Sequence, residues 1–425
     1  MLEERDVARN DSTEEGACKD TVCVPDLTLD RIYQAAHVLK GVLRQTELVP
    51  APNMTDRCDL YLKQENLQLT GSFKVRGAYF KTSVLTDAQQ QRGIIACSAG
   101  NHAQGVALAA QQSGLGATIF IPSVAPLSKI EATKQYGADI VLVDGVYDDA
   151  YEAALKYQEE TGAVFIHPFD DVDVIAGQGT IALELLAQAP DLDAVVVPIG
   201  GGGLIAGIAF AIKRLNPQCK VYGVQAADAN SMHQSRQHKK CCTLPSVSTF
   251  ADGIAVKQPG DLTFALCEKY VDDIVTVTDD EIATTILTLM EQQKIVAEGA
   301  GAIAAAAVLF DKLPLEGKKV CAIVSGGNID VNILSRVISR GLLTTGRLTQ
   351  LRLELLDKPG QLREVSGIIA DLGANVTQVQ HNAGGQNTDI CGCYLDISME
   401  TKNHQHLNEI KEALSAAGYR IIEDW

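Results

Sequence analysis

Residues 194–207 read AVVVPIGGGGLIAG, and this stretch decides the fold class of the chain. A β-branched run ends in four consecutive glycines and continues into the helical pattern LIAGIAFAIKRL. This order is typical of a strand–turn–helix unit, where backbone N–H groups and the helix dipole can hold an anion. Because adjacent glycines cost much chain entropy, we expect this turn to approach a phosphate closely.

The same alternation of short apolar runs and alanine-rich helical segments extends from about residue 26 to residue 345. It predicts a doubly wound α/β fold in two lobes, with parallel strands buried on both faces and a smaller lobe over roughly residues 70–170. Two more strand-to-helix turns occur, SAGNH at 98–102 and SGGN at 325–328. The carboxyl ends of parallel strands meet at one edge, so we expect the three turns to share a site.

The two ends of the chain differ from this pattern. The composition changes at residues 341–349, and residues 350–425 follow a β-α-β-β-α-β order that predicts a ferredoxin-like α+β domain. Residues 1–25 are polar and charged, which predicts a flexible tail. A helix is expected from Leu27 onward, with Thr28 or Asp30 as its N-cap.

The composition excludes several classes of protein. The 425 residues carry a formal net charge of −17, and a field of that sign repels nucleic acids and anionic lipids. The longest uncharged apolar run, residues 299–310, is too short to cross a membrane. The N-terminus is acidic and lacks the apolar core of a secretory signal, so we expect a cytoplasmic protein.

The eleven cysteines are scattered and odd in number, which indicates reduced thiols. Cys241-Cys242 and Cys391-Gly392-Cys393 come closest to metal-binding patterns. Neither has a second Cys-x-x-Cys or a nearby pair of histidines, so no metal site is predicted.

The segment GSFKVRG, residues 71–77, places Lys74 in the first turn of a helix, with Ser72 as the expected N-cap. The positive helix end and Arg76 both disfavour an ammonium group, so the pKa of Lys74 should fall. A lowered pKa suits an amine that forms an imine. From spacing alone, however, a surface lysine paired with Glu65 is the better interpretation.

A dinucleotide site is a second interpretation of the glycine turn. Residues 201–206 fit G-x-G-x-x-A loosely, and the next strand follows about 20 residues on. The residue expected to hold the ribose hydroxyls is Gln225 rather than Asp or Glu. This weakens the alternative of a nicotinamide oxidoreductase.

Taken together and in order, the motifs of the chain resemble the fold-type II pyridoxal-phosphate enzymes (tryptophan synthase β-like), and within them the threonine ammonia-lyases. The resemblance implies pyridoxal 5′-phosphate as cofactor and elimination of water from L-threonine to give 2-oxobutanoate and ammonia, with side activity on L-serine. After residue 350, DKPGQL and residues 373–376 resemble an ACT domain, a small regulatory module. The catalytic motifs are SFKVRGA (72–78), SAGNHAQG (98–105), PIGGGGLIAG (198–207), FADGIAV (250–256) and SGGN (325–328).

The resemblance also implies roles for individual residues. Lys74 would hold the cofactor through its amine and, once released, act as the base on the substrate Cα. Ser325 would face the pyridine nitrogen, and because a hydroxyl is neutral the ring would be a weaker electron sink, which favours elimination. Other cofactor contacts would come from Phe73, Asn101, Gly200, Gly201, Gly202, Gly203 and Leu204, and the substrate carboxylate would bind the turn Ser98, Ala99, Gly100, Asn101 and His102.

Three other polar residues near these motifs stay outside the predicted catalytic set. His102 is expected to shape its loop through hydrogen bonds, and His167 to end a strand. Glu298 either lines the site or caps a helix.

Two alternative functions remain. Serine racemases of this type carry a serine immediately before Gly-Asn-His, whereas this chain has Ala99, which cannot transfer a proton. A non-catalytic amino-acid sensor is an alternative from another class, and the intact Lys74, glycine turn and Ser325 argue against it.

The resemblance further implies partners for the chain. They are an amino-acid substrate, a second copy in a homodimer or homotetramer, and an amino-acid effector of the ACT-like domain. A branched-chain amino acid near residues 357–360 and Asn375 is favoured as the effector. Relatives often bind a divalent cation after the strand that ends at Gln225, but this chain offers Ala229 and Ser231 there, so none is expected.

Overall fold

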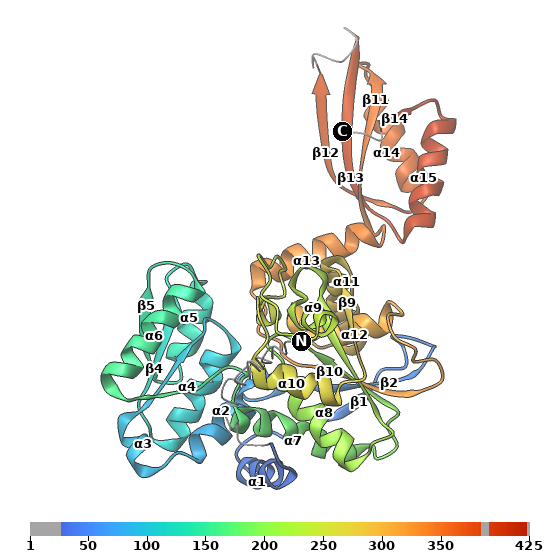
Figure 1. The fold of residues 1–425 in the computed structure, drawn as a ribbon. Helices are drawn as coiled ribbons and strands as arrows, with labels where there is room; N and C mark the ends of the chain where they lie inside the picture. The colour runs from blue at the N-terminus through green and yellow to red at the C-terminus, as the bar shows by residue number, and fades with distance from the viewer. Residues whose placement is uncertain (1–26, 384–390, 423–425) are drawn as a thin grey trace, which may run out of the picture.

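The computed structural model describes residues 27–383 and 391–422. Three sheets organise this part of the chain into a small lobe, a large lobe and a C-terminal domain (Figure 1). The predicted tail, residues 1–25, lies outside the described residues. Among the helices described, none is long and apolar enough to span a membrane.

The large lobe is built on a six-stranded sheet in the order β1-β2-β10-β7-β8-β9. All of its pairings are parallel except that of β1 with β2. Its strands are β1 (Leu48–Pro50), β2 (Asp59–Gln64), β7 (Ala194–Pro198), β8 (Lys220–Ala226), β9 (Asp273–Val277) and β10 (Lys319–Val324).

Strand β7, from the stretch that decides the fold, separates two apolar cores. Val196 belongs to the core under α12 (Gly299–Leu309), whereas Val195 and Val197 belong to the core under α8 (Gly203–Leu215). Every residue of β7 is buried because helices cover both faces of the sheet. The structure thus confirms the predicted parallel sheet buried on both sides.

The small lobe holds a four-stranded parallel sheet in the order β5-β4-β3-β6. Figure 1 shows it on the left, set apart from the large lobe. Its strands are β3 (Ile94–Cys97), β4 (Ala117–Pro122), β5 (Asp139–Val143) and β6 (Val164–Phe165).

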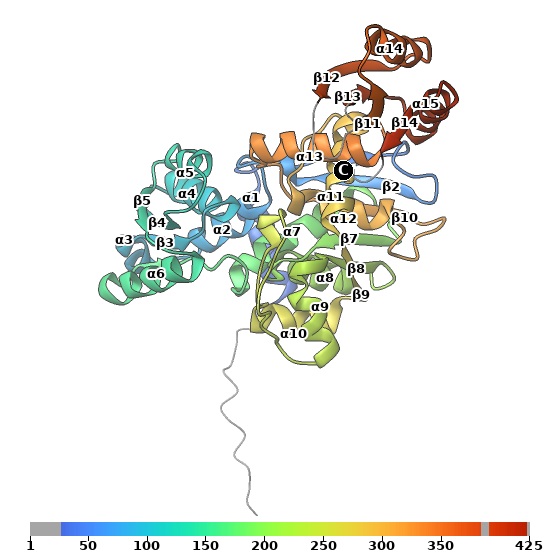
Figure 2. The same ribbon diagram turned by 90° about the horizontal axis from the view of Figure 1, so that it is seen from above.

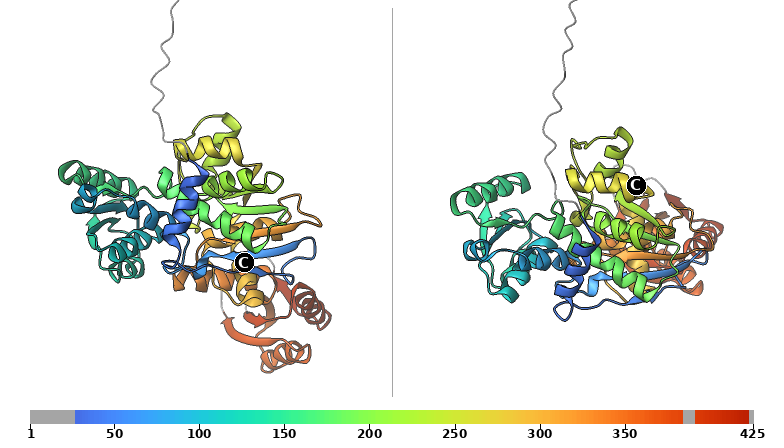
Figure 3. Two further views of the ribbon diagram at one scale, coloured as in Figure 1. Left: turned by 90° about the horizontal axis from the view of Figure 1, so that it is seen from below. Right: turned by 60° about the horizontal axis from the view of Figure 1, so that its bottom comes forward.

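Helices fill the connections between these strands. Of the two predicted caps, Thr28 rather than Asp30 is the N-cap of α1, because its Oγ1 accepts a hydrogen bond from Arg31 N at 3.1 Å. Figure 3 shows α1 at the junction of the two lobes. The other helices of the lobes, besides α8 and α12, are α2 (Lys74–Ser83), α3 (Asp87–Arg92), α4 (Asn101–Ser113), α5 (Leu127–Lys134), α6 (Tyr147–Thr161), α7 (Val172–Gln188), α9 (Ser231–His238), α10 (Asp261–Tyr270), α11 (Asp279–Thr288) and α13 (Val331–Thr344), with α1 spanning Leu29–Leu39.

Helix α2 joins the lobes by packing against α4 on one side and α7 on the other. Glycines permit both contacts. A Cβ on Gly177 of α7 would lie 2.6 Å from Cα of Gly77, and one on Gly105 of α4 would lie 3.1 Å from the Val75 nitrogen. These close crossings hold the first turn of α2, which carries Lys74, between the two lobes.

The C-terminal domain has a four-stranded antiparallel sheet in the order β12-β13-β11-β14. The core under its two helices confirms the predicted ferredoxin-like order β-α-β-β-α-β. Helix α13 leads from the large lobe to β11 (Figure 2). The elements are β11 (Leu348–Leu356), α14 (Gln361–Asp371), β12 (Asn375–Ala383), β13 (Gly392–Glu400), α15 (His404–Ala416) and β14 (Arg420–Ile422).

Candidate active site

The turns predicted to share a site do meet around the start of α2. Phe73 N donates to Ser325 O at 3.1 Å, which joins α2 to the turn after β10. Asn328 Nδ2 donates to Asn101 Oδ1 at 2.8 Å, which joins that turn to the first residue of α4. Lys74 Nζ donates to Pro168 O at 2.9 Å, beside the Phe169 ring that packs on Gly201.

Lys74 is the first residue of α2 and is half-buried between the lobes. Burial lowers the pKa of Lys74 to about 8, and the carboxylate of Glu298 opposes the shift. The direction predicted for this pKa is therefore right, but the cause is desolvation rather than the positive helix end and Arg76. Nζ also lies 5.3 Å from the centroid of the Phe73 ring.

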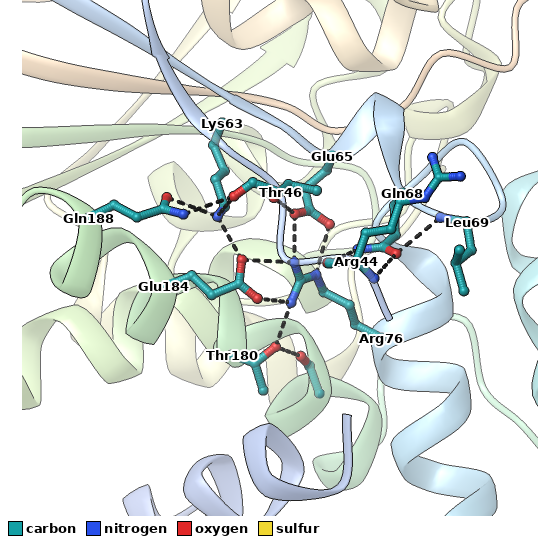
Figure 4. Close-up of polar contacts among 11 residues, drawn as sticks. Arg44, Thr46, Lys63, Glu65, Gln68, Leu69, Arg76, Thr180, Glu184 and Gln188 are labelled. Carbon is teal, nitrogen blue, oxygen red and sulfur yellow. Dashed lines mark hydrogen bonds and ion pairs between the residues drawn. The ribbon is translucent and has the colours of Figure 1, made fainter. Parts of the chain in front are cut away.

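Two other expectations for this segment are wrong. Phe73, not Ser72, is the N-cap residue of α2, and it makes no side-chain cap; Ser72 Oγ is buried without a hydrogen-bond partner in the described part of the chain. Glu65 does not pair with Lys74. Its two carboxylate oxygens accept hydrogen bonds from Arg76, both at 2.8 Å (Figure 4).

Glu298 lies at the site, although it is outside the catalytic set predicted from the sequence. It is the N-cap residue of α12 but makes no side-chain cap, so the capping alternative is wrong. Its Oε1 accepts a hydrogen bond from Asn101 Nδ2 at 2.5 Å. Burial, with a contribution from Asp252, raises the pKa of Glu298 to about 7. In the sequence, Glu298 is the one charged residue of the apolar segment VAEGAGA, residues 296–302, and this could have marked it as a functional residue.

The glycine loop lies at the N-terminus of α8, with Gly202 in the left-handed region at φ +100°. A Cβ on Gly201 would lie 2.4 Å from the Phe169 ring, and one on Gly202 would lie 2.7 Å from Met232 Cε. The protein's own packing thus requires these glycines. Gly200 and Gly203 are similarly crowded, and Leu204 is buried in the core beneath.

The same loop retains free hydrogen-bond donors. No residue in the described ranges accepts a hydrogen bond from the backbone N–H groups of residues 200–204. A row of unpaired N–H groups at a helix N-terminus fits a phosphate, so the residues present fit pyridoxal 5′-phosphate here.

The turn before α4 has a comparable form. Gly100 is the N-cap residue, and its N–H donates to Ser98 Oγ at 3.1 Å. The side chain of Ala99 packs against the small-lobe core. His102 is buried, with Nε2 2.7 Å from Ile166 O, and burial lowers its pKa to about 3. His102 therefore stays neutral and shapes the loop, as expected.

Ser325 and His167 have defined partners. Ser325 is buried, and its Oγ donates to Ala300 O at 3.0 Å. His167 Nδ1 accepts from Asp170 N at 2.7 Å, just after β6, in agreement with its expected role at a strand end. Gln225 donates to Ala229 O at 3.2 Å and accepts from His233 N at 2.8 Å.

A cavity of about 410 Å³ opens between the lobes beside Glu298 and Asn328. Lys129 of the small lobe forms an ion pair with Asp252 of the large lobe at this cavity. Ser128 Oγ donates to Asp330 Oδ2 at 3.1 Å, a second contact between the lobes. The cavity reaches Glu298 and Asn328, which are both hydrogen-bonded to Asn101.

Comparison with known proteins defines the class to which this site belongs. A model of the family described as pyridoxal-phosphate dependent enzyme matches residues 39–326. The structure of threonine deaminase isoform 2 from Solanum lycopersicum is similar, with a TM-score of 0.70 and 38% identity over 74% of this chain and 90% of that chain. Maize serine racemase has a TM-score of 0.69, also with 38% identity, over 74% and 98%.

Two curated relatives narrow the class. An L-threonine ammonia-lyase of Thermotoga maritima is 50% identical over 397 residues, 93% of this chain and 99% of that protein. A catabolic L-threonine dehydratase of Escherichia coli is 44% identical over 315 residues, 73% of this chain and 96% of that protein. The chain is a pyridoxal-phosphate dependent enzyme and belongs to the threonine ammonia-lyase family. Because β11 begins at Leu348, the longer match must extend into the C-terminal domain, whereas the shorter one need not.

Proposed function

We propose that this enzyme eliminates water from L-threonine and releases 2-oxobutanoate and ammonia, with weaker activity on L-serine. Serine differs from threonine by one methyl group, which is worth about 1–3 kcal/mol in a pocket. The observation that carries the proposal is a half-buried amine, Lys74, with a pKa of about 8 near Glu298, which is hydrogen-bonded to Asn101.

Pyridoxal 5′-phosphate, when bound, supplies the electron sink that makes the substrate Cα proton acidic. The N–H groups of residues 200–204 would hold its phosphate, and Asn101, Phe73 and Ser325 would hold its ring. Lys74 would bind it covalently and then, as a free amine, accept the Cα proton. A neutral Lys74 is accessible near pH 8 because burial disfavours its ammonium form.

The substrate is oriented by the turn before α4. The first N–H groups of α4, at Asn101 and His102, point from a helix N-terminus and suit the substrate carboxylate. His102 is neutral and hydrogen-bonded to Ile166 O, so it positions this turn without exchanging protons. The contacts of Lys129 and Ser128 link the two lobes beside the cavity and would limit the access of water to the reacting groups.

Replacement of the proposed base tests this mechanism. Lys74→Ala should lose the visible absorbance of the bound cofactor and the release of 2-oxo acid from threonine. Lys81→Ala is the matched control, because Lys81 lies on the same helix but pairs with Asp171 and Asp173. Turnover by Lys74→Ala near the wild-type rate would rule out this assignment.

A racemase reaction needs a second proton-transfer group on the face opposite Lys74, and Ala99 provides none. Ala99→Ser should therefore raise the formation of D-serine, or solvent deuterium exchange at Cα, relative to elimination. Chiral chromatography and mass spectrometry measure both. No increase in a folded, cofactor-loaded variant would show that the hydroxyl at residue 99 does not decide between the reactions.

We propose regulation by an amino acid at the C-terminal domain. The division into a catalytic part, residues 26–345, and a regulatory part, residues 350–425, belongs to this proposal, as do a homodimer or homotetramer and a cytoplasmic location. A branched-chain amino acid is the favoured effector. Asn375 lies at the β12 end paired with Glu400, whereas the turn at 357–360 follows the β11 end paired with Gly392, so one chain does not bring the two predicted contacts together. We therefore keep residues 357–360, and not Asn375, as the proposed contact with the effector.

Truncation after Thr344 tests the regulatory proposal. The shortened enzyme should still release 2-oxobutanoate but should no longer respond to isoleucine or valine. Equilibrium binding adds a second measurement, since an effector that changes substrate affinity must have its own affinity changed equally by substrate. Intact enzyme that ignores every amino acid tested would leave assembly as the role of the domain.

A further inference from the structure

The end of the C-terminal sheet where β11 and β12 finish and β13 begins brings together three side chains that are distant in sequence, Asp357, His381 and Cys393. One ligand atom from each, a carboxylate oxygen, an imidazole nitrogen and a thiol sulfur, lies within 4.8 Å of the others. Asp357 and His381 are exposed, and Cys393 is buried. No pair of histidines lies near Cys393 in the chain, so the sequence alone does not predict a metal site here.

Strand register explains this convergence. Cys393 pairs with Ala383 of β12 and with Leu355 of β11. Side chains two residues apart along a strand share a face, so His381 and Asp357 stand on the same face as Cys393. The Asp357 N–H donates to Cys391 O at 2.8 Å, which continues the ladder and fixes the position of the aspartate.

We propose that Asp357, His381 and Cys393 bind a zinc ion. Thiolate, imidazole and carboxylate are the ligands that Zn²⁺ prefers in proteins, and the three together can occupy three corners of a tetrahedron. A thiolate and a carboxylate carry two negative charges, which balance the dication. His381 Nε2 already lies 3.5 Å from Asp357 Oδ1, so the ligands need only small side-chain rotations.

Asp357, His381 and Cys393 also line a cavity, which would leave room for a fourth ligand. This cavity of about 140 Å³ is also lined by Lys358, Gly360, Gln361 and Leu362. Structural zinc sites fill all four positions with protein ligands, whereas sites that bind a small molecule keep one open. This site therefore suits an exchangeable water or small ligand at the turn before α14.

The bound ion would connect three strand ends. Asp357 follows β11, His381 lies near the end of β12, and Cys393 lies near the start of β13. A ligand that binds only the folded state stabilises it, so the melting temperature of the domain should rise with zinc concentration. This property does not depend on the proposed lyase reaction and can be measured whether or not that reaction occurs.

Metal titration of the full chain tests the site. Cofactor-loaded enzyme is treated with a chelator, dialysed into a buffer free of amino acids, and titrated with Zn²⁺ by calorimetry and with Co²⁺ by absorbance. We expect one ion per chain and a Co²⁺ spectrum with thiolate charge-transfer and tetrahedral ligand-field bands. His381→Gln and Cys393→Val should weaken binding by at least about 10- to 100-fold, the loss that even outer-shell changes produce.

The choice of variants keeps the test decisive. His381 is exposed, so His381→Gln should leave the fold intact even if Cys393→Val, in the core, lowers stability. Cys242→Ser is the matched control, because Cys242 is half-buried and donates to Lys240 O, outside this cluster. Wild-type enzyme that binds neither ion, or variants that bind both as tightly as wild type, would overturn the proposal and leave an ordinary surface His–Asp pair.

Discussion

Lys74 and Arg76 lie two residues apart on α2, and packing removes water from both cations, yet their surroundings are opposite. Arg76 donates to both oxygens of Glu65 and both oxygens of Glu184, and the pKa of its guanidinium is raised (Figure 4). Lys74 donates to one backbone carbonyl, and its pKa falls to about 8. A buried charge with full pairing supports structure, whereas one with little pairing becomes reactive.

The two buried carboxylates repeat this contrast. Arg76 is the main attractive partner of Glu65 and holds the pKa of this carboxyl below its usual range despite burial. Glu298 has Asn101 as its hydrogen-bonding partner, and its pKa is raised to about 7. Glu65, which is paired with a cation, therefore stays ionised and supports the fold, whereas Glu298, which lacks such a partner among the described residues, can titrate near neutral pH.

The largest expected effect on stability comes from removing Arg76, the cation that is paired with Glu65 and Glu184. Arg76→Met should lower the free energy of unfolding by about 3–5 kcal/mol, because Glu65 is left charged and buried without its partner. Urea denaturation measures the change. Arg340→Met is a control with little expected effect, because Arg340 pairs with Asp280 on the surface. The double variant Arg76→Met, Glu65→Met should lose less than the sum of the single changes, and strict additivity would contradict the pairing account.

Removing the Lys74 cation should raise the free energy of unfolding rather than lower it. Below a pH of about 8 the folded chain must bury the Lys74 ammonium, whereas in the unfolded chain this group stays charged up to its ordinary pKa of 10.5. The free-energy cost of burying this charge is absent above pH 10.5 and reaches its full size once the pH has fallen through 8. Lys74→Met apoenzyme should therefore be more stable than wild-type apoenzyme at pH 7, by about 1–3 kcal/mol.

Thermal melting of both apoenzymes at several pH values checks this prediction. The difference in melting temperature should shrink as the pH rises through about 8. A Lys74→Met apoenzyme that melts below wild type at pH 7 would mean that Lys74 stabilises the fold in the same way as Arg76.

The smallest expected effect comes from replacing Glu298, the carboxyl group with a pKa of about 7. Glu298→Gln keeps the side-chain volume and an oxygen that can accept from Asn101 Nδ2, but it removes the ionisation near pH 7. We expect kcat to fall about tenfold, equivalent to about 1.4 kcal/mol in the barrier. The pH profile of kcat/KM should lose a transition near pH 7.

The paired acid provides the control for this prediction. Glu65→Gln should lower stability and leave the position of that transition unchanged, because Glu65 contacts Arg76 and Thr46 and not the reacting groups. A profile for Glu298→Gln identical to that of wild type would show that Glu298, too, has only a structural role.

Local sequence determined the parts of this enzyme that depend on residues near one another in the chain. The β-branched run before Gly200 predicted β7, and the four glycines after it predicted a turn with free N–H groups. The cap of α1 was narrowed to Thr28 or Asp30, and it is Thr28. Strand and helix periodicity and turn chemistry act over a few residues, so they can be recognised without the fold.

Tertiary structure alone decided what each charged residue does. Arg76 looked like a neighbour that lowers the pKa of Lys74, but the fold turns it toward Glu184, more than a hundred positions away. Glu298 and Asn101 meet from two lobes, and Asp357, His381 and Cys393 meet through strand register. The pKa of a group depends on its burial and on charges a few ångströms away, and both are set by packing between distant segments.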